Sequence, residues 1–509
     1  MKKLILSAAA LFLAAMFVSA QTPKVTTQWE SKYNKNLQKF NWFVDYLGED
    51  ANSYYILSGR KSGPMARNYG VEKYDKQTLQ PTATKEFKKM WIEDIYRIGG
   101  DTYVRVYENP PQYFKVTQTP HYQLYKFNKA AMTFDVVMKA ADINMENVVV
   151  SPDKSKLLFV VKEAAKKKDG GDTYKIVVSD DKFNKLWNKS LAQSSIKDYV
   201  ISNDGTVYVA SKSTNKETKE ERFVITKVEK DTTQKFSVNM KNFMVHKIKI
   251  APSANNKLLV FGFATDKTNE NKTGACYFSM NEEFNKPENV QFKEIPLSLL
   301  NASSKKKRVN NRYDDFAFGT VLYGENGEVA VAAEETEVYS ITKITTEKPA
   351  GGQGMAKTTK TTTRYQHNYD TYVFKVNGDK LAWVKRVPKN QKVGEDENKV
   401  TNKLADRMGY AMMLSSDNVV VFFNDNITTN MNVNETTEKV PMIERKDMNL
   451  VSVTIDANGK QTKQAVDLSA LAKDKLQVEV QKIYPLSNGM ALTHARQGKG
   501  AKIGIITIK

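Results

Sequence analysis

A short repeated unit is the feature of this chain that most restricts its fold. In each copy an apolar strand-like segment runs into a turn rich in Gly, Asn, Asp, Ser or Pro, and a second apolar segment follows. That order is the signature of a β-hairpin. Eight copies can be aligned, at residues 45–59, 95–107, 148–161, 199–211, 248–262, 316–333, 412–423 and 482–494.

Each hairpin is followed by a polar loop and a second pair of strand-like segments, so that the unit contains four strands. Clear examples of the second pair are residues 174–191, 222–238, 371–387 and 450–468. Comparable positions in successive units are 49, 54, 50, 51, 71, 90 and 71 residues apart. Four antiparallel strands at roughly this repeat are typical of a β-propeller. We therefore predict an all-β fold, a single β-propeller of eight four-stranded blades, with seven as the alternative count.

The two ends of the chain complement each other. The last unit supplies three strands before Lys509, and residues 24–30 form a strand-like segment with no partner of their own. We predict that this N-terminal segment is the outermost strand of the last blade, with Thr27 near Ile506. Such pairing removes an open sheet edge.

Residues 151–160, Ser-Pro-Asp-Lys-Ser-Lys-Leu-Leu-Phe-Val, resemble the repeat motif of TolB-like and related WD40-like propellers, in which a Ser-Pro-Asp-Gly turn precedes an apolar strand. The resemblance covers about ten residues in a blade and is weaker in the others. It implies an exported propeller and carries over no functional residues. The sialidase-type box is not matched at residues 202–208, because Asp204 and Gly205 are adjacent.

The first twenty residues have the pattern of a secretory signal: two lysines, an apolar segment, and small residues up to Ala20. We expect cleavage after Ala20, a mature chain that begins at Gln21, and a periplasmic or secreted location. No later segment has the roughly 20 apolar residues of a membrane helix. The one cysteine, Cys276, cannot form an internal disulfide, and we interpret it as a buried apolar residue.

The formal net charge is +20, and it comes mostly from lysine. Such a charge favours anionic partners at long range. Proteins that recognise nucleic acids favour arginine for bidentate contacts, so we expect no nucleic-acid partner. One concentrated basic run, Lys305, Lys306, Lys307 and Arg308, is either simply solvated or contacts an acidic glycan, phospholipid head groups or an acidic protein.

Insertions are concentrated in the later part of the predicted propeller domain, residues 21–509. They are expected at about 300–313, 334–368, 391–406 and 424–447. In the second, two Thr-rich strand-like segments flank a Gly-rich tip, which indicates a projecting hairpin arm; the alternative is a polar loop without fixed structure. In a four-stranded meander the long connections emerge on one face, and long loops on a rigid scaffold commonly carry binding sites.

Three carboxylates recur just before the innermost strand of a unit: Asp94, Asp198 and Asp315. We expect them at the channel mouth on the long-loop face. They are either polar residues at exposed strand starts, a cation site, or a pair of hydrolytic acids of the kind that glycosidases use. Other units have Asn147, Lys247 and Gln481 at this position, so the ring of carboxylates is incomplete.

No motif for nucleophilic, phosphate-binding or metal-dependent catalysis is present, and we predict no cofactor and no metal. The four histidines, His121, His246, His367 and His494, lie far from Cys276 in sequence. The leading hypothesis is a non-enzymatic exported propeller that binds a protein or anionic glycan partner in the bacterial cell envelope. The alternatives are a carbohydrate-active enzyme with its acids at the channel mouth, and a structural subunit of an envelope assembly.

Overall fold

The computed structural model describes most of the chain in sixteen segments. They are residues 23–30, 42–61, 67–88, 90–107, 122–139, 147–163, 173–193, 195–214, 221–240, 242–300, 307, 312–347, 357–396, 407–443, 448–497 and 500–509. The proposed signal sequence lies outside these residues. In the segments that the structure describes, no helix has the length and apolar character needed to span a membrane.

The first four sheets are four-stranded and antiparallel, and each uses consecutive strands of the chain. The first contains β2 (Trp42–Glu49), β3 (Ser53–Lys61), β4 (Arg67–Asp75) and β5 (Pro81–Phe87). The second contains β6 (Ile92–Ile98), β7 (Asp101–Tyr107), β8 (Tyr122–Asn128) and β9 (Thr133–Lys139). The third contains β10 (Asn147–Val150), β11 (Lys156–Glu163), β12 (Thr173–Asp180) and β13 (Lys185–Ala192). The fourth contains β14 (Ile196–Ile201), β15 (Val207–Thr214), β16 (Glu221–Val228) and β17 (Thr233–Ser237).

The later sheets are more varied. The fifth contains β18 (Phe243–Pro252), β19 (Leu258–Asp266), β20 (Thr273–Met280) and β21 (Pro287–Glu294). The sixth contains β22 (Phe316–Phe318), β23 (Leu322–Tyr323), β24 (Glu328–Glu347), β25 (Lys357–Asn377), β26 (Lys380–Val387) and β27 (Gln391–Asp396). The seventh contains β28 (Ala411–Ser415), β29 (Asn418–Asp425), β30 (Asn449–Ile455) and β31 (Gln461–Ala465). The last joins β1 (Val25–Trp29) to β32 (Gln477–Val478), β33 (Tyr484–Pro485), β34 (Met490–Gln497) and β35 (Gly500–Ile508).

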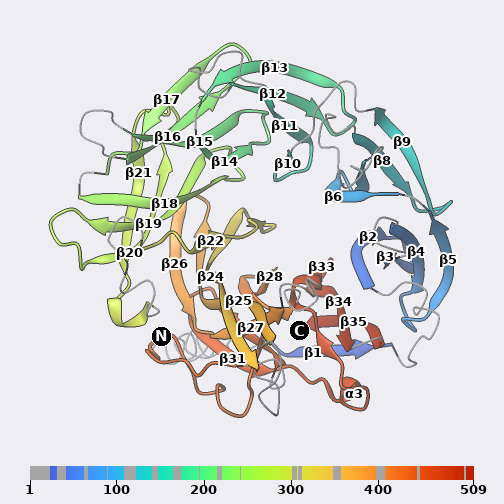
Figure 1. Cartoon of the computed structure of the whole chain (residues 1–509). Helices are drawn as coiled ribbons and strands as arrows, with labels where there is room; N and C mark the ends of the chain where they lie inside the picture. The colour runs from blue at the N-terminus through green and yellow to red at the C-terminus, as the bar shows by residue number, and fades with distance from the viewer. Residues whose placement is uncertain are drawn as a thin grey trace, which may run out of the picture.

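The sheets follow one another around a common centre, and the first sheet lies beside the last (Figure 1). Helical structure in the described segments is limited to short connectors, among them η2 (Leu297–Leu299), α3 (Ser469–Ala472) and η7 (Val480–Lys482). This arrangement of four-stranded antiparallel units around one axis is the β-propeller architecture. The prediction of an all-β fold with propeller architecture is confirmed.

Apolar clusters hold the ring together, and the larger ones each join two neighbouring sheets. Leu157 and Phe159 of the third sheet, for example, pack with Tyr103 of the second, whereas Leu158 and Val160 pack with the fourth. Successive side chains of a strand point to opposite faces, so one strand contributes to two interfaces. A further cluster joins the last sheet to the first, through residues such as Leu492, Ile505, Phe43 and Tyr54.

Ring closure occurs where the sequence predicted it. β1 pairs antiparallel with β35 at the outer edge of the last sheet, with Thr27 opposite Ile506. Trp29 lies opposite Gly504, and a Cβ atom at Gly504 would come within 2.5 Å of the Trp29 ring. The glycine therefore provides the space in which the tryptophan ring covers the closing strand pair.

The sixth sheet departs from the predicted pattern of four strands. It has six strands, and residues 391–396, expected within a loop insertion, form β27 and pair with residues 363–368 of β25. The predicted arm at 334–368 is a regular hairpin, because β24 and β25 remain paired from Glu328–Asn377 to Glu347–Lys357. Without β27, the outer part of β25 would have an unpaired edge. The polar segment Gln391–Asp396 becomes a strand because it pairs with this edge.

Two buried carboxyl groups lie near the closing strand. Glu30 follows β1, is 1% exposed, and donates its backbone N–H to the Ile503 carbonyl oxygen at 3.1 Å. Burial raises the pKa of Glu30 to about 8; the negative charge of Glu72 adds to this shift, whereas the Ile503 backbone and Lys502 oppose it. Burial also raises the pKa of Glu72 to about 7. The hydrogen bond that Ser58 donates to Glu72 at 2.7 Å acts in the opposite direction and lowers this pKa.

Replacing Gly504 by alanine should destabilise the closure. The added methyl group overlaps the Trp29 ring, and overpacking of this kind costs about 1–3 kcal/mol. Urea unfolding of Gly504→Ala, Trp29→Leu and the double variant would measure this cost. We expect the double variant to be more stable than the sum of the single effects predicts, because the leucine leaves room for the methyl group. Strictly additive effects would contradict the proposed contact.

The buried Glu30 should make stability depend on pH. Its pKa is higher in the folded chain than the ordinary value of 4.5, so stability is complete below pH 4.5 and falls as the pH rises to about 8. Glu30→Gln removes this charge and should be more stable than the parent by roughly 2–4 kcal/mol at pH 8, with little difference at pH 4.5. Denaturant unfolding at several pH values tests this, and a difference independent of pH would refute it.

Candidate functional site

Of the three sequence-predicted carboxylates, Asp315 lies just before β22, whereas Asp94 and Asp198 lie within β6 and β14, near the start of each strand. Each of the three is held by a cation. Asp94 in β6 pairs with Arg105 of the neighbouring β7. Asp315, just before β22, pairs with Lys307. Of the basic run, Lys305, Lys306 and Arg308 lie outside the described residues, and Lys307 is engaged in this ion pair.

Asp198 links two sheets. One carboxylate oxygen accepts a hydrogen bond from Lys249 Nζ at 2.9 Å, and the other accepts one from the Ile250 backbone N–H at 2.9 Å. Both partners belong to β18 of the next sheet. Burial raises the pKa of Asp198, and the charge of Lys249 opposes that shift. This geometry gives Asp198 a role in joining the fourth and fifth sheets.

A cavity of about 710 Å³ lies at the opposite end of the innermost strands. It is lined by turn residues from several sheets, and none of Asp94, Asp198 and Asp315 contributes to it. Its charged lining residues are balanced in sign: Arg97, Lys129 and Lys154 against Glu49, Asp101 and Glu325. Arg97 is itself bound to Asp45 at 2.5 Å and lies over the Tyr484 ring. The lining of this cavity is therefore not predominantly acidic.

The remaining candidate nucleophiles and ligands are internal. Burial raises the pKa of the Cys276 thiol to about 12. Burial lowers the pKa of His246 to about 4, and this ring hydrogen-bonds Thr265 at 2.9 Å. His494 contacts Glu479 at 2.7 Å, and His367 contacts Asn390 at 2.6 Å. His121 lies outside the described residues, within which no group of three or more His, Cys, Asp and Glu side chains forms a metal site.

A network of buried polar groups holds the base of the arm formed by β24 and β25. Asp370 of β25 accepts a hydrogen bond from Arg386 Nε at 2.7 Å and one from the Lys389 backbone N–H at 3.1 Å. The Lys389 ammonium pairs with Glu334 of β24, which also accepts a hydrogen bond from Asn368 at 2.6 Å. Burial raises the pKa of Asp370, and the charge of Arg386 opposes the shift. The network fixes the direction in which the arm leaves the sheet.

The insertion at 426–443 docks against the same base. Arg386 Nη1 donates to the Glu435 carbonyl oxygen at 3.0 Å and to that of Thr437 at 2.8 Å. Asn390 Nδ2 donates to the Val440 carbonyl oxygen at 2.8 Å, and Ile443 forms a parallel bridge with Gln391. A segment predicted only as a long loop is therefore joined by hydrogen bonds to β26 and to the start of β27, beside the base of the arm.

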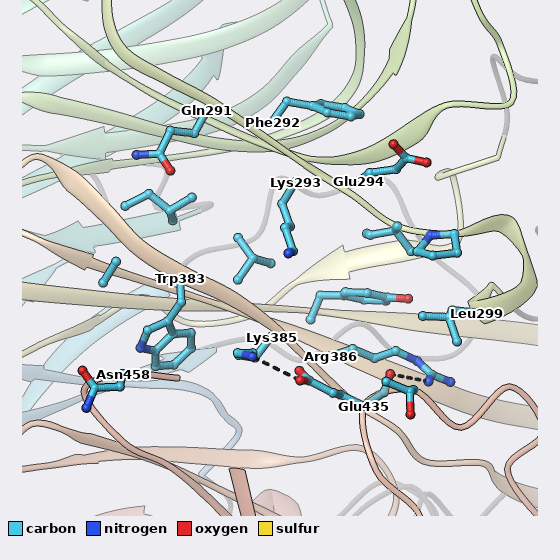
Figure 2. A pocket seen from close by; sticks show the side chains of 17 residues that line it. Gln291, Phe292, Lys293, Glu294, Leu299, Trp383, Lys385, Arg386, Glu435 and Asn458 are labelled. Atoms are coloured by element: carbon cyan, nitrogen blue, oxygen red, sulfur yellow. Dashed lines mark hydrogen bonds and ion pairs between the residues drawn. The ribbon is translucent and has the colours of Figure 1, made fainter. Parts of the chain in front are cut away.

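A groove lies beside this insertion, between the outer strands β21 and β26 (Figure 2). Its volume is about 610 Å³. The walls combine an apolar surface that includes Trp383 with charged groups, among them Lys293 and the Lys385–Glu435 ion pair at 3.2 Å. Sequence reasoning missed this groove because no single segment forms it: its walls come from residues 291–296, 299, 372, 381–386, 435–436 and 458.

The arm carries exposed apolar side chains along β24. Val338, Ile341 and Ile344 are 50%, 51% and 66% exposed. Between Val338 and Ile341, the Tyr339 ring stacks on the Tyr365 ring with centroids 5.3 Å apart, and Lys392 of β27 lies 4.7 Å from the Tyr365 centroid. The arm therefore combines an aromatic pair covered by a lysine with exposed apolar contact surface.

Comparison with known proteins supports no assignment beyond the fold. No protein-family model matches the chain, and no curated protein matches it. The β-propeller domain of the Trilobed protease from Pyrococcus furiosus is 10% identical, with 84% of this chain and 95% of that chain covered and a TM-score of 0.37. The polysaccharide lyase Uly1 is 10% identical, with 96% and 99% covered and a TM-score of 0.34. An acylaminoacyl peptidase from Pyrococcus horikoshii is 9% identical, with 92% and 60% covered and a TM-score of 0.37.

Removing the guanidinium of Arg386 should be costly. Arg386→Met leaves the Asp370 carboxylate buried without its cation, which costs about 3–5 kcal/mol. The matched control is Lys385→Met, since the adjacent Lys385 pairs with Glu435 near the surface and such pairs contribute about 0–1 kcal/mol. Denaturant unfolding of both variants measures the difference. Equal losses would show that the buried network does not stabilise the base of the arm.

Proposed function

We propose that this chain is an exported, non-enzymatic propeller of eight blades that binds a protein or anionic glycan partner in the bacterial cell envelope. The binding surface is the rim formed by the arm (β24 and β25), the insertion at 426–443 and the adjacent groove. Export rests on the signal-like sequence of residues 1–20. The blade count rests on the eight separate sheets, and the TolB-like relationship rests on the repeat motif alone.

One observation carries the proposal: the arm and the insertion are fixed to each other by a buried network that has no part in closing the ring. Burying charges such as Asp370 and Arg386 is expensive, and pairs of this kind are best known for specifying one geometry. An arm held in one direction presents its exposed surface to a partner with little loss of conformational freedom on binding. The net positive charge favours a partner with acidic groups.

The carbohydrate-active alternative receives less support. Its three candidate acids are each bound to a cation, Arg105, Lys249 and Lys307 respectively. A general acid of a glycosidase needs a raised pKa and access to the glycosidic oxygen. Burial raises the pKa of Asp198, but its carboxylate is engaged by Lys249 and by the Ile250 backbone.

Shortening the arm tests the proposed function. Ile341 and Thr363 are directly opposite, so an Asn-Gly turn in place of residues 342–362 should close the hairpin while residues 363–368 still pair with β27. We expect normal folding and at least tenfold weaker capture of an envelope partner in pull-down experiments. A matched control, Lys154→Ser at the axial cavity, should capture the partner normally.

Capture that survives removal of the arm would reject this assignment. Loss of capture in the Lys154→Ser control as well would place binding at the axial cavity instead. Circular dichroism and thermal unfolding of each variant establish that the fold is intact.

A further inference from the structure

The groove between β21 and β26 contains a lysine that no acid neutralises. Successive residues of β21 face alternate sides, and Lys293 lies opposite Ala275, whose side chain packs toward the sixth sheet. Lys293 therefore faces the groove, and Figure 2 shows its side chain extending toward β26. The residue is exposed and has no ion-pair partner among the residues that the structure describes.

The acidic side chains nearest to this lysine are directed elsewhere. Glu294 lies on the opposite face of β21, where Phe292 stacks on Phe243 with ring centroids 4.3 Å apart, on the side of the fourth sheet. The carboxylate of Glu435 is paired with Lys385 at 3.2 Å. Charge complementarity in the groove therefore favours an acidic ligand.

Aliphatic side chains form much of the remaining wall. Pro296 and Leu299 follow β21, and Leu381 and Val384 belong to β26. Pro296 is exposed, and the other three are half-buried. Trp383 is only 8% exposed, so little of its ring is free to stack on a sugar. Such walls suit a ligand that carries apolar side chains beside its carboxylate.

The edge of β26 that borders the groove directs backbone groups outward. Gln461 Nε2 of β31, in the seventh sheet, donates to the Arg386 carbonyl oxygen at 2.9 Å. In an antiparallel sheet the N–H and C=O of one residue point the same way, and the direction alternates along the strand. The register shows no bulge between Val384 and Arg386, so the N–H and C=O of Val384 also point away from β25. Within the described segments, neither group of Val384 has a hydrogen-bond partner.

The register of the sixth sheet gives the same direction independently. The Gly319 N–H donates to the Ala332 carbonyl oxygen at 2.9 Å, so the backbone groups of Ala332 point away from β25. Ala332 lies opposite Val373, and Val373 lies opposite Lys385. The backbone groups of Val373 therefore point toward β26 and those of Lys385 toward β25, which leaves the two neighbours of Lys385 facing outward.

We propose that this groove binds an extended acidic peptide segment of the partner, which adds as a strand to the β26 edge at Val384 and places a carboxylate against Lys293. Strand addition supplies affinity through backbone hydrogen bonds and specificity through alternate side chains. The side chains on the β21 side of the added strand are apolar, acidic and apolar, at every second residue. The inference rests on the proposed function, since the groove belongs to the same binding rim, and it names the chemistry of the partner.

A short peptide with this pattern is the probe. Fluorescein-labelled Thr-Leu-Thr-Glu-Thr-Leu-Thr places the two leucines and the glutamate on one face of a strand. Fluorescence anisotropy should show saturable binding to the parent chain. The same peptide with lysine in place of glutamate should bind at least about tenfold more weakly, because its ammonium group would oppose Lys293.

Methylation of the peptide backbone tests strand addition without any change to the protein. One peptide is methylated at the amide nitrogen of its glutamate, and another at that of the threonine that follows. Adjacent N–H groups of a strand point to opposite sides, so only one of the two faces β26. We expect one methylated peptide to lose binding at least about tenfold and the other to bind within about twofold of the parent peptide.

Two charge reversals locate the site on the protein. Lys293→Glu should weaken binding of the acidic peptide at least about tenfold. Lys235→Glu is the matched control, because Lys235 is also exposed and lies on β17, the outermost strand of the preceding sheet. Both variants have the same net charge, so long-range attraction is equal in the two. The control should bind the acidic peptide as the parent chain does.

Several results would overturn the proposal. They are binding that does not saturate at about 0.5 mM chain, equal binding of the acidic and basic peptides, equal effects of the two methylations, or equal losses in the two lysine variants. Tighter binding of an oligosaccharide of uronic acids, abolished by Lys293→Glu, would make a glycan the occupant instead. The variant that lacks residues 342–362 retains every residue of the groove, so its partner capture tests the proposed function separately from the peptide titration.

Discussion

The apolar contact between neighbouring sheets is the interaction on which the rest of this structure depends. A four-stranded sheet such as β18–β21 has two faces rich in apolar side chains, and water would be in contact with both of them if the sheet stood alone. Leu258 and Val260 pack against the fourth sheet, whereas Leu259 and Phe261 pack against the sixth. Because every sheet needs a neighbour on both sides, the sheets close into a ring, and the chain does this without a disulfide.

The sequence predicted the features that depend on local pattern. The hairpins were visible because alternating apolar residues flank turn residues, as in residues 148–161. The closing strand was predicted because residues 24–30 had no other partner, and β1 pairs with β35 as expected. The arm at 334–368 was recognisable because Thr-rich strands flank a Gly-rich tip. Strand β27 was missed because Gln391–Asp396 is polar and lacks an apolar alternation; the open edge of β25 makes it a strand.

The sequence did not predict features formed by residues that lie far apart along the chain. Asp198 was recognised as a recurring carboxylate, but its partner Lys249 lies on the next sheet, and only the packing of the two sheets brings them together. The groove in Figure 2 combines walls from the fifth and sixth sheets with residues of the insertion at 426–443. The buried network of Asp370, Arg386 and Lys389 likewise joins residues whose charges suggest surface positions.

The pairing of β1 with β35 also constrains the order in which the molecule is assembled. β1 precedes every other strand of the ring in the sequence and β35 follows them all, so the closing sheet is incomplete until β35 has been synthesised. Until then, the last sheet does not cover one apolar face of the first sheet or the side chain of Glu72. Apolar faces that are exposed during synthesis are prone to associate with other chains.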